Sequence, residues 1–301
     1  MKLAAVDIGS NAVRLLLSRV YDENDTPFFK KESLIRMPLR LGEDAFLRKK
    51  ISRENIDRLV ATMVGFRYLM KGYPAIDYMA CATSAMREAE NSKEILRQVY
   101  EASGIEIEII SGMREAEIIY ANRIADLLDP NKNYLYIDVG GGSTELTLFS
   151  NGAPLQSQSF NIGTVRLLNN LVPDTSWDEM KKWVKINIRT LDNLTAIGSG
   201  GNINKLVKIA NVKQGRFLQT KKLREIAKML QSFSLEDRIR KLNMRADRAD
   251  VIVPAAQIYL STLKWGRIKD ISVPSIGLAD GIIHLLYEKH TTNFFNQANA
   301  Y

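Results

Sequence analysis

The stretch YLYIDVGGGST (residues 134–144) decides the fold, because it repeats the pattern of LAAVDIGSN (residues 3–11). In each stretch a short apolar run reaches an aspartate, and a turn centred on glycine follows. Glycine permits the backbone angles that such a turn demands. A second apolar run comes next, at residues 15–17 in the first copy and around residues 146–149 in the second. The echo predicts two copies of one strand–turn–strand unit.

The segments after each turn repeat as well. After the first turn the pattern predicts strands near 26–36, 76–82 and 105–110 and helices over 52–71, 92–103 and 113–128, with Ser52 as an N-cap. After the second turn it predicts strands over 153–161, 194–198 and 270–274 and helices over 177–191, 201–210 and 247–265, with a basic helical insert at 220–245 and a last helix from about 280.

Both halves therefore have the element order βββαβαβα. This order predicts an α/β protein of two duplicated lobes, residues 1–125 and 126–301, in which the last helix can pack back on the first lobe. Two such lobes enclose a cleft, and ligands of α/β proteins bind at the carboxyl ends of the strands. We therefore expect the site in an interlobe cleft.

Composition narrows the chemistry. The chain has 301 residues, of which 46% are hydrophobic and 25% charged, as in ordinary globular proteins. Cys81 is the single cysteine and there are two histidines, which excludes an internal disulfide and a Cys-rich zinc site. Carboxylate sites for Mg²⁺ stay open. No apolar run approaches the ~20 residues of a membrane span, and the N-terminus lacks a signal-peptide core, so we expect a soluble cytoplasmic protein.

The positive charge is concentrated in one stretch. The chain has a net charge of +8, whereas residues 178–250 alone contain 17 basic and 8 acidic residues. A localised basic region suggests an anionic partner such as nucleic acid, a polyphosphate or an acidic membrane surface. A set of solvated helix faces explains the same charge, and both readings stay open.

Four turns contain glycine: Asp7–Asn11, Asp138–Thr144, Gly198–Gly201 and Gly277–Gly281. None has the spacing of a P-loop or of a Rossmann fingerprint. The N–H groups of a hairpin turn can hold phosphate oxygens, and an adjoining aspartate can bind Mg²⁺. Two such turns that face each other across a cleft would grip a phosphate chain from both sides.

Two further residues are candidates. Arg87, in a polar turn at residues 83–89 after a strand, suits a bidentate phosphate contact, although a surface arginine that starts a helix has the same sequence. Glu115, in the first turn of a helix, could orient an attacking water as general base. A carboxylate that only stabilises the helix dipole would occupy the same position.

The segments VDIGSN (6–11), ATSAMR (82–87), ISG (110–112) with Glu115, and IDVGGGSTE (137–145) resemble the exopolyphosphatase / guanosine pentaphosphate phosphohydrolase family. That family belongs to the actin, sugar-kinase and heat-shock-chaperone fold superfamily, whose lobes are ribonuclease-H-like. The resemblance extends from Lys2 to about Leu286, and IGSGG (197–201) and GLADG (277–281) match the family's later turns.

The resemblance implies Mg²⁺-dependent hydrolysis of a terminal phosphoanhydride. It gives the role of catalytic base to Glu115, and other catalytic roles to Arg87, Asp138 and Glu145. The implied phosphate-binding residues are Asp7, Gly9, Ser10, Asn11, Gly140, Gly141, Gly142, Ser143, Gly200 and Gly201, and the implied metal ligands are Asp138, Glu145, Asp7 and Asp280. Asn202 and His284 depart from the family pattern, and the chain resembles the short two-lobe form.

The leading hypothesis is an exopolyphosphatase that releases orthophosphate and prefers short chains. Guanosine pentaphosphate is the competing substrate. Two alternatives from other classes stay open: an ATP-dependent kinase of a small metabolite, and a sensor that binds nucleotide or polyphosphate without turnover. We expect no membrane partner and no nucleic-acid partner, and a homodimer is possible.

Overall fold

The computed structural model describes residues 1–23, 26–121, 129, 131–188, 191–212, 217–274 and 276–298. The chain forms two compact units: Met1–Asn122 together with Gly277–Tyr301, and Arg123–Ile276. The C-terminal segment thus belongs to the first unit. The last part of the helix predicted over 113–128 lies outside the described residues.

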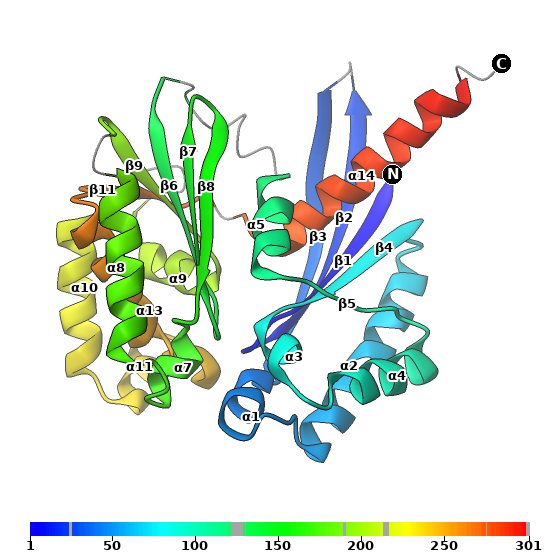
Figure 1. Cartoon of the computed structure of the whole chain (residues 1–301). Coiled ribbons are helices and arrows are strands. Elements are labelled where there is room, and N and C mark those ends of the chain that lie inside the picture. Colours follow the sequence, from blue (N-terminus) through cyan, green and yellow to red (C-terminus); the bar gives the residue numbers. More distant parts are fainter. Residues whose placement is uncertain are drawn as a thin grey trace. The chain divides into compact units, whose positions relative to one another are not determined.

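The first unit is built on a five-stranded sheet with the order β3-β2-β1-β4-β5 (Figure 1). Its strands are β1 (Lys2–Ile8), β2 (Val13–Glu23), β3 (Thr26–Met37), β4 (Asp77–Ala82) and β5 (Glu108–Ile109). β2 pairs antiparallel with β1 and β3, whereas β1, β4 and β5 run parallel. The parallel strands bring Ile8, Ala82 and Ile109 into register at their carboxyl ends.

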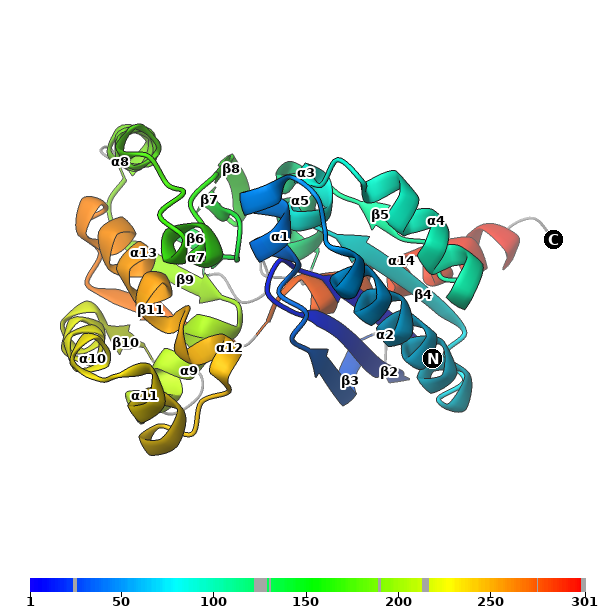
Figure 2. The same ribbon diagram turned by 90° about the horizontal axis from the view of Figure 1, so that it is seen from below.

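The helices of this unit are α1 (Leu41–Arg48), α2 (Arg53–Gly72), α3 (Ser84–Glu88), α4 (Ser92–Ser103), α5 (Gly112–Tyr120) and α14 (Leu278–Ala298). Helices α2 and α4 pack on one face of the sheet and α14 on the other (Figures 1 and 2). Helix α14 approaches α5 so closely that a Cβ on Gly281 would lie 1.9 Å from the Ile118 carbonyl oxygen. The predicted N-cap of α2 is confirmed, since the Ser52 hydroxyl accepts from the Asn55 N–H.

The second unit has a six-stranded sheet with the order β10-β11-β9-β6-β7-β8. Its strands are β6 (Asn133–Val139), β7 (Thr144–Ser150), β8 (Ala153–Phe160), β9 (Leu194–Ser199), β10 (Leu218–Gln219) and β11 (Asp270–Ser272). Read from β8 to β11, the order and the strand directions are those of the first sheet, and β10 is added at the edge. The prediction of a duplicated α/β fold is therefore confirmed.

The helices of the second unit are α7 (Thr164–Leu168), α8 (Asp174–Ile188), α9 (Gly201–Ile209), α10 (Thr220–Ser232), α11 (Leu235–Lys241), α12 (Ala246–Ala249) and α13 (Ile252–Trp265). The prediction of a single helix over 247–265 is wrong, because the helix is interrupted between α12 and α13. Pro254 explains the break: it cannot donate to a carbonyl four residues earlier, but it is tolerated in the first turn of α13.

Apolar side chains of β6, β9, α8, α9, α10 and α13 form the core of the second unit. Tyr259 of α13 is among its largest fully buried side chains. Among the residues that the structure describes, no helix combines the length and the apolarity that a membrane crossing requires.

Candidate active site

Asp7 lies near the carboxyl end of β1, where it is only 5% exposed. It faces Arg14 on β2 and Cys81 on β4 in the sheet register. Arg14 Nη1 donates to Asp7 Oδ2 at 2.5 Å. This ion pair holds the carboxylate at the start of the turn that follows β1.

Backbone hydrogen bonds from the start of α1 support the turn Gly9–Asn11. The Gly9 N–H donates to the Ala12 carbonyl at 3.1 Å. The Ser10 carbonyl accepts from the Gly42 N–H at 2.8 Å, and the Asn11 carbonyl from the Arg40 N–H at 3.1 Å. Residues 40–42 therefore hold the carbonyls of this turn with backbone groups.

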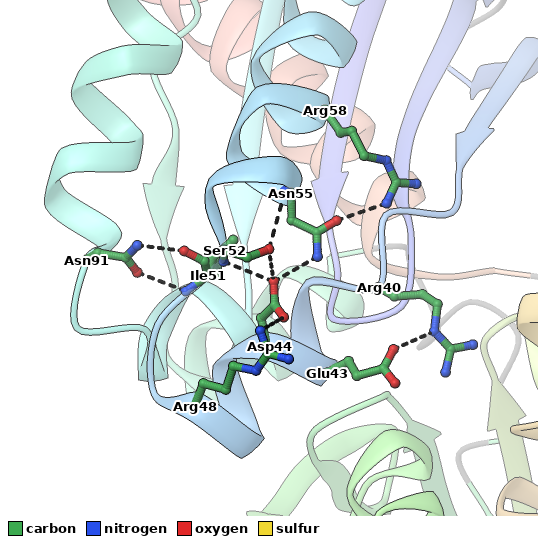
Figure 3. A network of polar contacts seen from close by, with 9 residues as sticks. All are labelled: Arg40, Glu43, Asp44, Arg48, Ile51, Ser52, Asn55, Arg58 and Asn91. Carbon is green, nitrogen blue, oxygen red and sulfur yellow. Dashed lines mark hydrogen bonds and ion pairs between the residues drawn. The ribbon is translucent and has the colours of Figure 1, made fainter.

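Helix α1 is fixed in turn by a polar network around Asp44 (Figure 3). Asp44 Oδ2 accepts from the Ser52 N–H at 2.9 Å, from the Ser52 hydroxyl at 2.5 Å and from Asn55 Nδ2 at 2.8 Å. Burial would raise the pKa of Asp44, but the hydrogen bonds from Ser52 and Asn55 outweigh it and hold the pKa below its usual value. Asn91 exchanges two hydrogen bonds with the Ile51 backbone, which ties α4 to the same junction.

The segment after β4 joins the same end of the sheet. The Thr83 N–H donates to the Ile8 carbonyl, and the hydroxyls of Ser84 and Ser10 lie 2.8 Å apart. The polar turn predicted at 83–89 is a short helix, α3, over Ser84–Glu88, a correction to the prediction. Too few residues follow Thr83 to show helical periodicity, which is why the sequence did not indicate it.

Arg87 of α3 is tethered to the next segment. Its Nη1 donates to the Ile110 carbonyl at 2.7 Å. In the part of the chain that the structure describes, no carboxylate forms an ion pair with its guanidinium. One nitrogen is thus used for positioning while the side chain is exposed, which is compatible with an anion contact.

Glu115 occupies the first turn of α5, as predicted. Ser111 caps this helix by accepting from the Arg114 N–H at 3.1 Å, and the Glu115 N–H bonds the Ser111 carbonyl at 2.9 Å. Burial raises the pKa of the Cys81 thiol to about 12, and the negative charges of Glu108, Asp7 and Glu115 add to the rise. Asp7 is the register partner of Cys81 on β4, and α5, which carries Glu115, follows the segment whose Ile110 N–H bonds the Ala82 carbonyl at the end of β4.

Asp280 lies in the first turn of α14, and both of its carboxylate oxygens have partners within the same unit. Its Oδ1 lies 2.6 Å from Lys31 Nζ on β3, and its Oδ2 accepts from the Gly277 N–H at 3.0 Å. The Lys31 ammonium therefore already neutralises the carboxylate to which the resemblance gives a metal-binding role. His284, one turn later, stacks on Phe29 with ring centroids 3.7 Å apart.

In the second unit, the turn Gly140–Ser143 is closed by the Gly140 N–H, which donates to the Ser143 carbonyl at 2.9 Å. The other carbonyls of the turn point at α7. Gly140 O accepts from the Thr164 N–H at 3.0 Å, Gly141 O from the Val165 N–H at 2.8 Å, and Gly142 O from Arg166 Nε at 2.7 Å. Sequence reasoning missed Arg166, and no local signal connects it to a turn more than 20 residues earlier.

These contacts decide where the N–H groups of the turn point. In a planar trans peptide, the carbonyl and the N–H of the next residue point in opposite directions. Each carbonyl held by α7 therefore turns the following N–H away from α7. Within the described residues, the N–H groups of Gly141, Gly142 and Ser143 have no backbone acceptor. A row of outward N–H groups is the usual geometry for binding an anion.

Gly163 makes the close approach of α7 possible. Its backbone is extended, with φ of −132°, so the residue is not required for a left-handed conformation. A Cβ at this position would lie 2.3 Å from the Gly141 carbonyl oxygen and 2.4 Å from the Gly142 carbonyl carbon. Only hydrogen fits between the two backbones.

Asp138 and Glu145 lie directly opposite each other on β6 and β7, so their side chains share one face of the sheet. Glu145 is 3% exposed, and its Oε1 accepts from the Ser159 hydroxyl at 2.8 Å. Asp138 Oδ1 would be 3.3 Å from a Cβ on Gly200, which has a positive φ of 94°. The glycine thus leaves room beside the Asp138 carboxylate.

Tyr259 of α13 holds the carboxyl end of β9, the strand next to β6, by a hydrogen bond. Its hydroxyl donates to the Ser199 carbonyl at 2.7 Å, and Ser199 is the register partner of Asp138. Complete burial raises the pKa of Tyr259, and the charge of Asp138 raises it further. The phenol is therefore a neutral donor beside the site.

This acidic pair fits Mg²⁺. Like charges opposite each other in a sheet repel, and a divalent cation would relieve that repulsion. Mg²⁺ is usually held by one or two carboxylates together with substrate phosphates and water. Among the described residues, no group of three or more His, Cys, Asp or Glu side chains could hold a metal ion. The pair therefore suits an ion that is also bound by the substrate. The other two metal ligands that the resemblance implies, Asp7 and Asp280, belong to the first unit.

Part of the basic stretch has structural roles. Arg248 Nη1 donates to the Gly201 carbonyl at 2.6 Å, at the start of α9. Lys205 Nζ donates to the Leu242 carbonyl at 2.7 Å, and Arg238 Nη1 to the Ala249 carbonyl at 3.1 Å. Further cations pair with carboxylates on α10 and α11: Lys222 with Glu225, Arg240 with Glu236, and Lys241 with Asp237.

The structure therefore brings Asp7, Ser10, Arg87 and Glu115 to one end of the first sheet. It brings Asp138, Glu145 and the turns at 140–143 and 200–201 to one end of the second. Their catalytic, phosphate-binding and metal-binding roles, and the interlobe cleft, stay predictions.

The chain is similar in sequence to several known proteins, including the following three. The chain is 33% identical over 223 residues to a bifunctional 3-dehydroquinate synthase/phosphatase of Fusobacterium nucleatum. This alignment covers 68% of the present chain but only 34% of that longer protein. The chain is 25% identical to exopolyphosphatase 1 of Mycobacterium tuberculosis, covering 94% and 87% of the two chains. It is 25% identical to a guanosine-5'-triphosphate,3'-diphosphate pyrophosphatase of Aeromonas hydrophila, covering 95% and 60%.

A solved structure has the same fold. The crystal structure of an exopolyphosphatase from Cytophaga hutchinsonii superimposes with a TM-score of 0.83 at 23% identity, covering 96% of this chain and 98% of that one. The family model described as the Ppx/GppA phosphatase family matches residues 28–290, which is most of the chain. The chain therefore belongs to the Ppx/GppA phosphatase family.

Proposed function

We propose that the protein hydrolyses the terminal phosphoanhydride bond of inorganic polyphosphate with Mg²⁺ and releases orthophosphate. The observation that carries the proposal is the turn Gly140–Ser143, whose outward N–H groups lie beside the acidic pair Asp138 and Glu145. A turn of N–H donors next to two carboxylates suits a ligand made of phosphate groups and a hard cation.

In the reaction, Glu115 takes a proton from a water molecule whose oxygen attacks the terminal phosphorus. The bond from that phosphorus to the bridging oxygen breaks, and the shortened chain leaves on that oxygen. Arg87 and the N–H groups of the turn at 140–143 stabilise the charge on the phosphoryl oxygens. Asp138 and Glu145 would hold Mg²⁺, which when bound supplies neutralisation of phosphate charge.

The basic stretch favours short chains as substrates. Each further phosphate of a long chain needs its own cation or N–H partner. Several cations between 178 and 250 are already used: Lys205, Arg238 and Arg248 bond carbonyls, and Lys222, Arg240 and Lys241 pair with carboxylates. Each of these cations already has a protein partner, so fewer cations of the stretch are fully available to follow a long chain.

Guanosine pentaphosphate is the second candidate substrate. The Aeromonas relative, whose name specifies this type of nucleotide, aligns with 95% of the chain. The same turn and acidic pair would serve its terminal phosphate, since the reacting bond is again a phosphoanhydride.

The test is to incubate purified protein with tripolyphosphate, with polyphosphate of tens and of hundreds of residues, and with guanosine pentaphosphate, each with Mg²⁺ or EDTA. Orthophosphate release is measured per chain end. We expect Mg²⁺-dependent release, with a higher kcat/KM for the shortest chains. Binding without release would indicate a sensor, and ADP formation that requires an acceptor would indicate a kinase. Either result would overturn the proposal.

A further inference from the structure

Arg166 is a buried arginine behind the phosphate-binding turn proposed above, and it is only 8% exposed. It lies in the short helix α7, two residues after Thr164. Its Nε donates to the Gly142 carbonyl at 2.7 Å, and this hydrogen bond is buried from solvent. Arginine is costly to bury, so its presence at this position requires a reason.

Holding the turn in place does not by itself require a guanidinium. In the first unit, the corresponding carbonyls of Ser10 and Asn11 are held by the backbone N–H groups of Gly42 and Arg40. In the second unit, Thr164 and Val165 hold two carbonyls in the same way. The third carbonyl, that of Gly142, is the one that receives a charged donor.

The peptide group that Arg166 contacts also carries a donor of the turn. The Gly142 carbonyl and the Ser143 N–H belong to one planar peptide and point in opposite directions. A cation on the carbonyl oxygen draws electron density from the peptide and makes its N–H a stronger donor, as in cooperative hydrogen-bond chains. It also stops the peptide from flipping, which would present the carbonyl oxygen to an anion.

We propose that Arg166 is a positioning residue for phosphate: through the Gly142 carbonyl it orients and polarises the Ser143 N–H, which donates to a phosphate group on the turn. The inference rests on the proposed function for the identity of the anion. Arg166 itself does not touch the substrate.

The experiment measures orthophosphate binding without Mg²⁺ by calorimetry, alongside KM and kcat for tripolyphosphate. The variants are Arg166→Gln, which removes the charge, and Arg166→Lys, which keeps it. Lys228→Gln is the matched control, because it removes one positive charge from an exposed position of the same unit. Thermal melting is recorded for each protein, so that the Kd and the kinetic constants refer to the folded fraction alone.

We expect Arg166→Gln to raise the Kd for orthophosphate and the KM for tripolyphosphate together by about tenfold, the size of one strengthened hydrogen bond, with a smaller change in kcat. Arg166→Lys should fall between wild type and the Gln variant, and Lys228→Gln should match wild type. A lower melting temperature with an unchanged Kd in the folded Gln variant would show a purely structural role and overturn the inference. Equal losses in the Lys and Gln variants would also overturn it.

If the Gln variant does not fold, the Lys variant decides. Its Kd for orthophosphate should exceed that of Lys228→Gln by a few-fold, and a wild-type Kd would refute the inference. The two proposals fail separately. Wild-type protein that binds orthophosphate but cleaves no phosphoanhydride refutes the function alone, whereas cleavage by wild type with an unchanged Kd in Arg166→Gln refutes only the role of Arg166.

Discussion

Gly163→Ala perturbs the turn Gly140–Ser143 with a single methyl group. The added carbon would lie 2.3 Å from the Gly141 carbonyl oxygen, whereas ordinary contact begins at 3.4 Å. Because both neighbours are backbone atoms, no side chain can rotate away, and the turn and α7 must separate by about 1 Å. The substitution needs no unusual backbone conformation, since φ at this residue is −132°. Its effect is therefore purely steric.

Two magnitudes follow from this displacement. Inserting a methyl group into close-packed structure costs about 1–3 kcal/mol of folding free energy. Separation also lengthens the hydrogen bonds from Thr164, Val165 and Arg166 that aim the N–H groups of the turn. A misplacement of ~1 Å at groups that stabilise a transition state can lower the rate about 10²-fold.

The assay combines urea unfolding with orthophosphate release from tripolyphosphate. Gly65→Ala is the matched control: its Cβ would meet nothing within 4 Å, and the residue lies inside helix α2. We expect this control to keep full activity and to gain about 0.5–1 kcal/mol in the free energy of unfolding. A Gly163→Ala protein with wild-type kcat/KM and wild-type stability would refute the steric argument. Lost stability with unchanged kcat/KM would refute the role of this turn in catalysis.

Three further predictions concern carboxylates. Glu115→Gln should keep the fold and orthophosphate binding but lower kcat by roughly 10²–10⁴, the usual range for a general base, so near-normal turnover would remove Glu115 from the mechanism. Asp138→Asn should raise the Mg²⁺ concentration needed for half-maximal rate, because one carboxylate of the acidic pair is lost; superimposable Mg²⁺ titrations would contradict this. Asp44→Asn should lower the free energy of unfolding by about 2 kcal/mol at pH 7, since Ser52 and Asn55 donate to a charged acceptor. Because the pKa of Asp44 is lowered on folding, its contribution is present above the usual carboxyl pKa and disappears as the pH falls through the folded value, so the difference from wild type in urea unfolding should shrink on acidification.

The repeated pattern of apolar run, aspartate and glycine turn predicted the duplication and the order of elements along the chain, whereas the strand order within each sheet came from the structure. Long helices such as α2 and α4 were predicted nearly to the residue, because an amphipathic face extends over several turns. The short helices α1, α3 and α7 were missed, since a stretch of five to eight residues has too few turns to show the period. Those helices are the ones that support the site.

The sequence by itself determined the α/β class, the duplication and the chemical types of the candidate site residues, because these depend on local patterns: hydrophobic period, glycine turns and the carboxylates beside them. Only the tertiary structure decided which carbonyl each donor meets. The bond from Arg166 to Gly142 joins residues on separate elements, and nothing in either local sequence specifies it. The same holds for Lys31, which takes one oxygen of Asp280 from a strand distant in sequence. Local sequence sets which face of an element is buried, whereas the packing of one element on another sets which polar groups meet. In this protein that packing directs the N–H groups of the turn at 140–143.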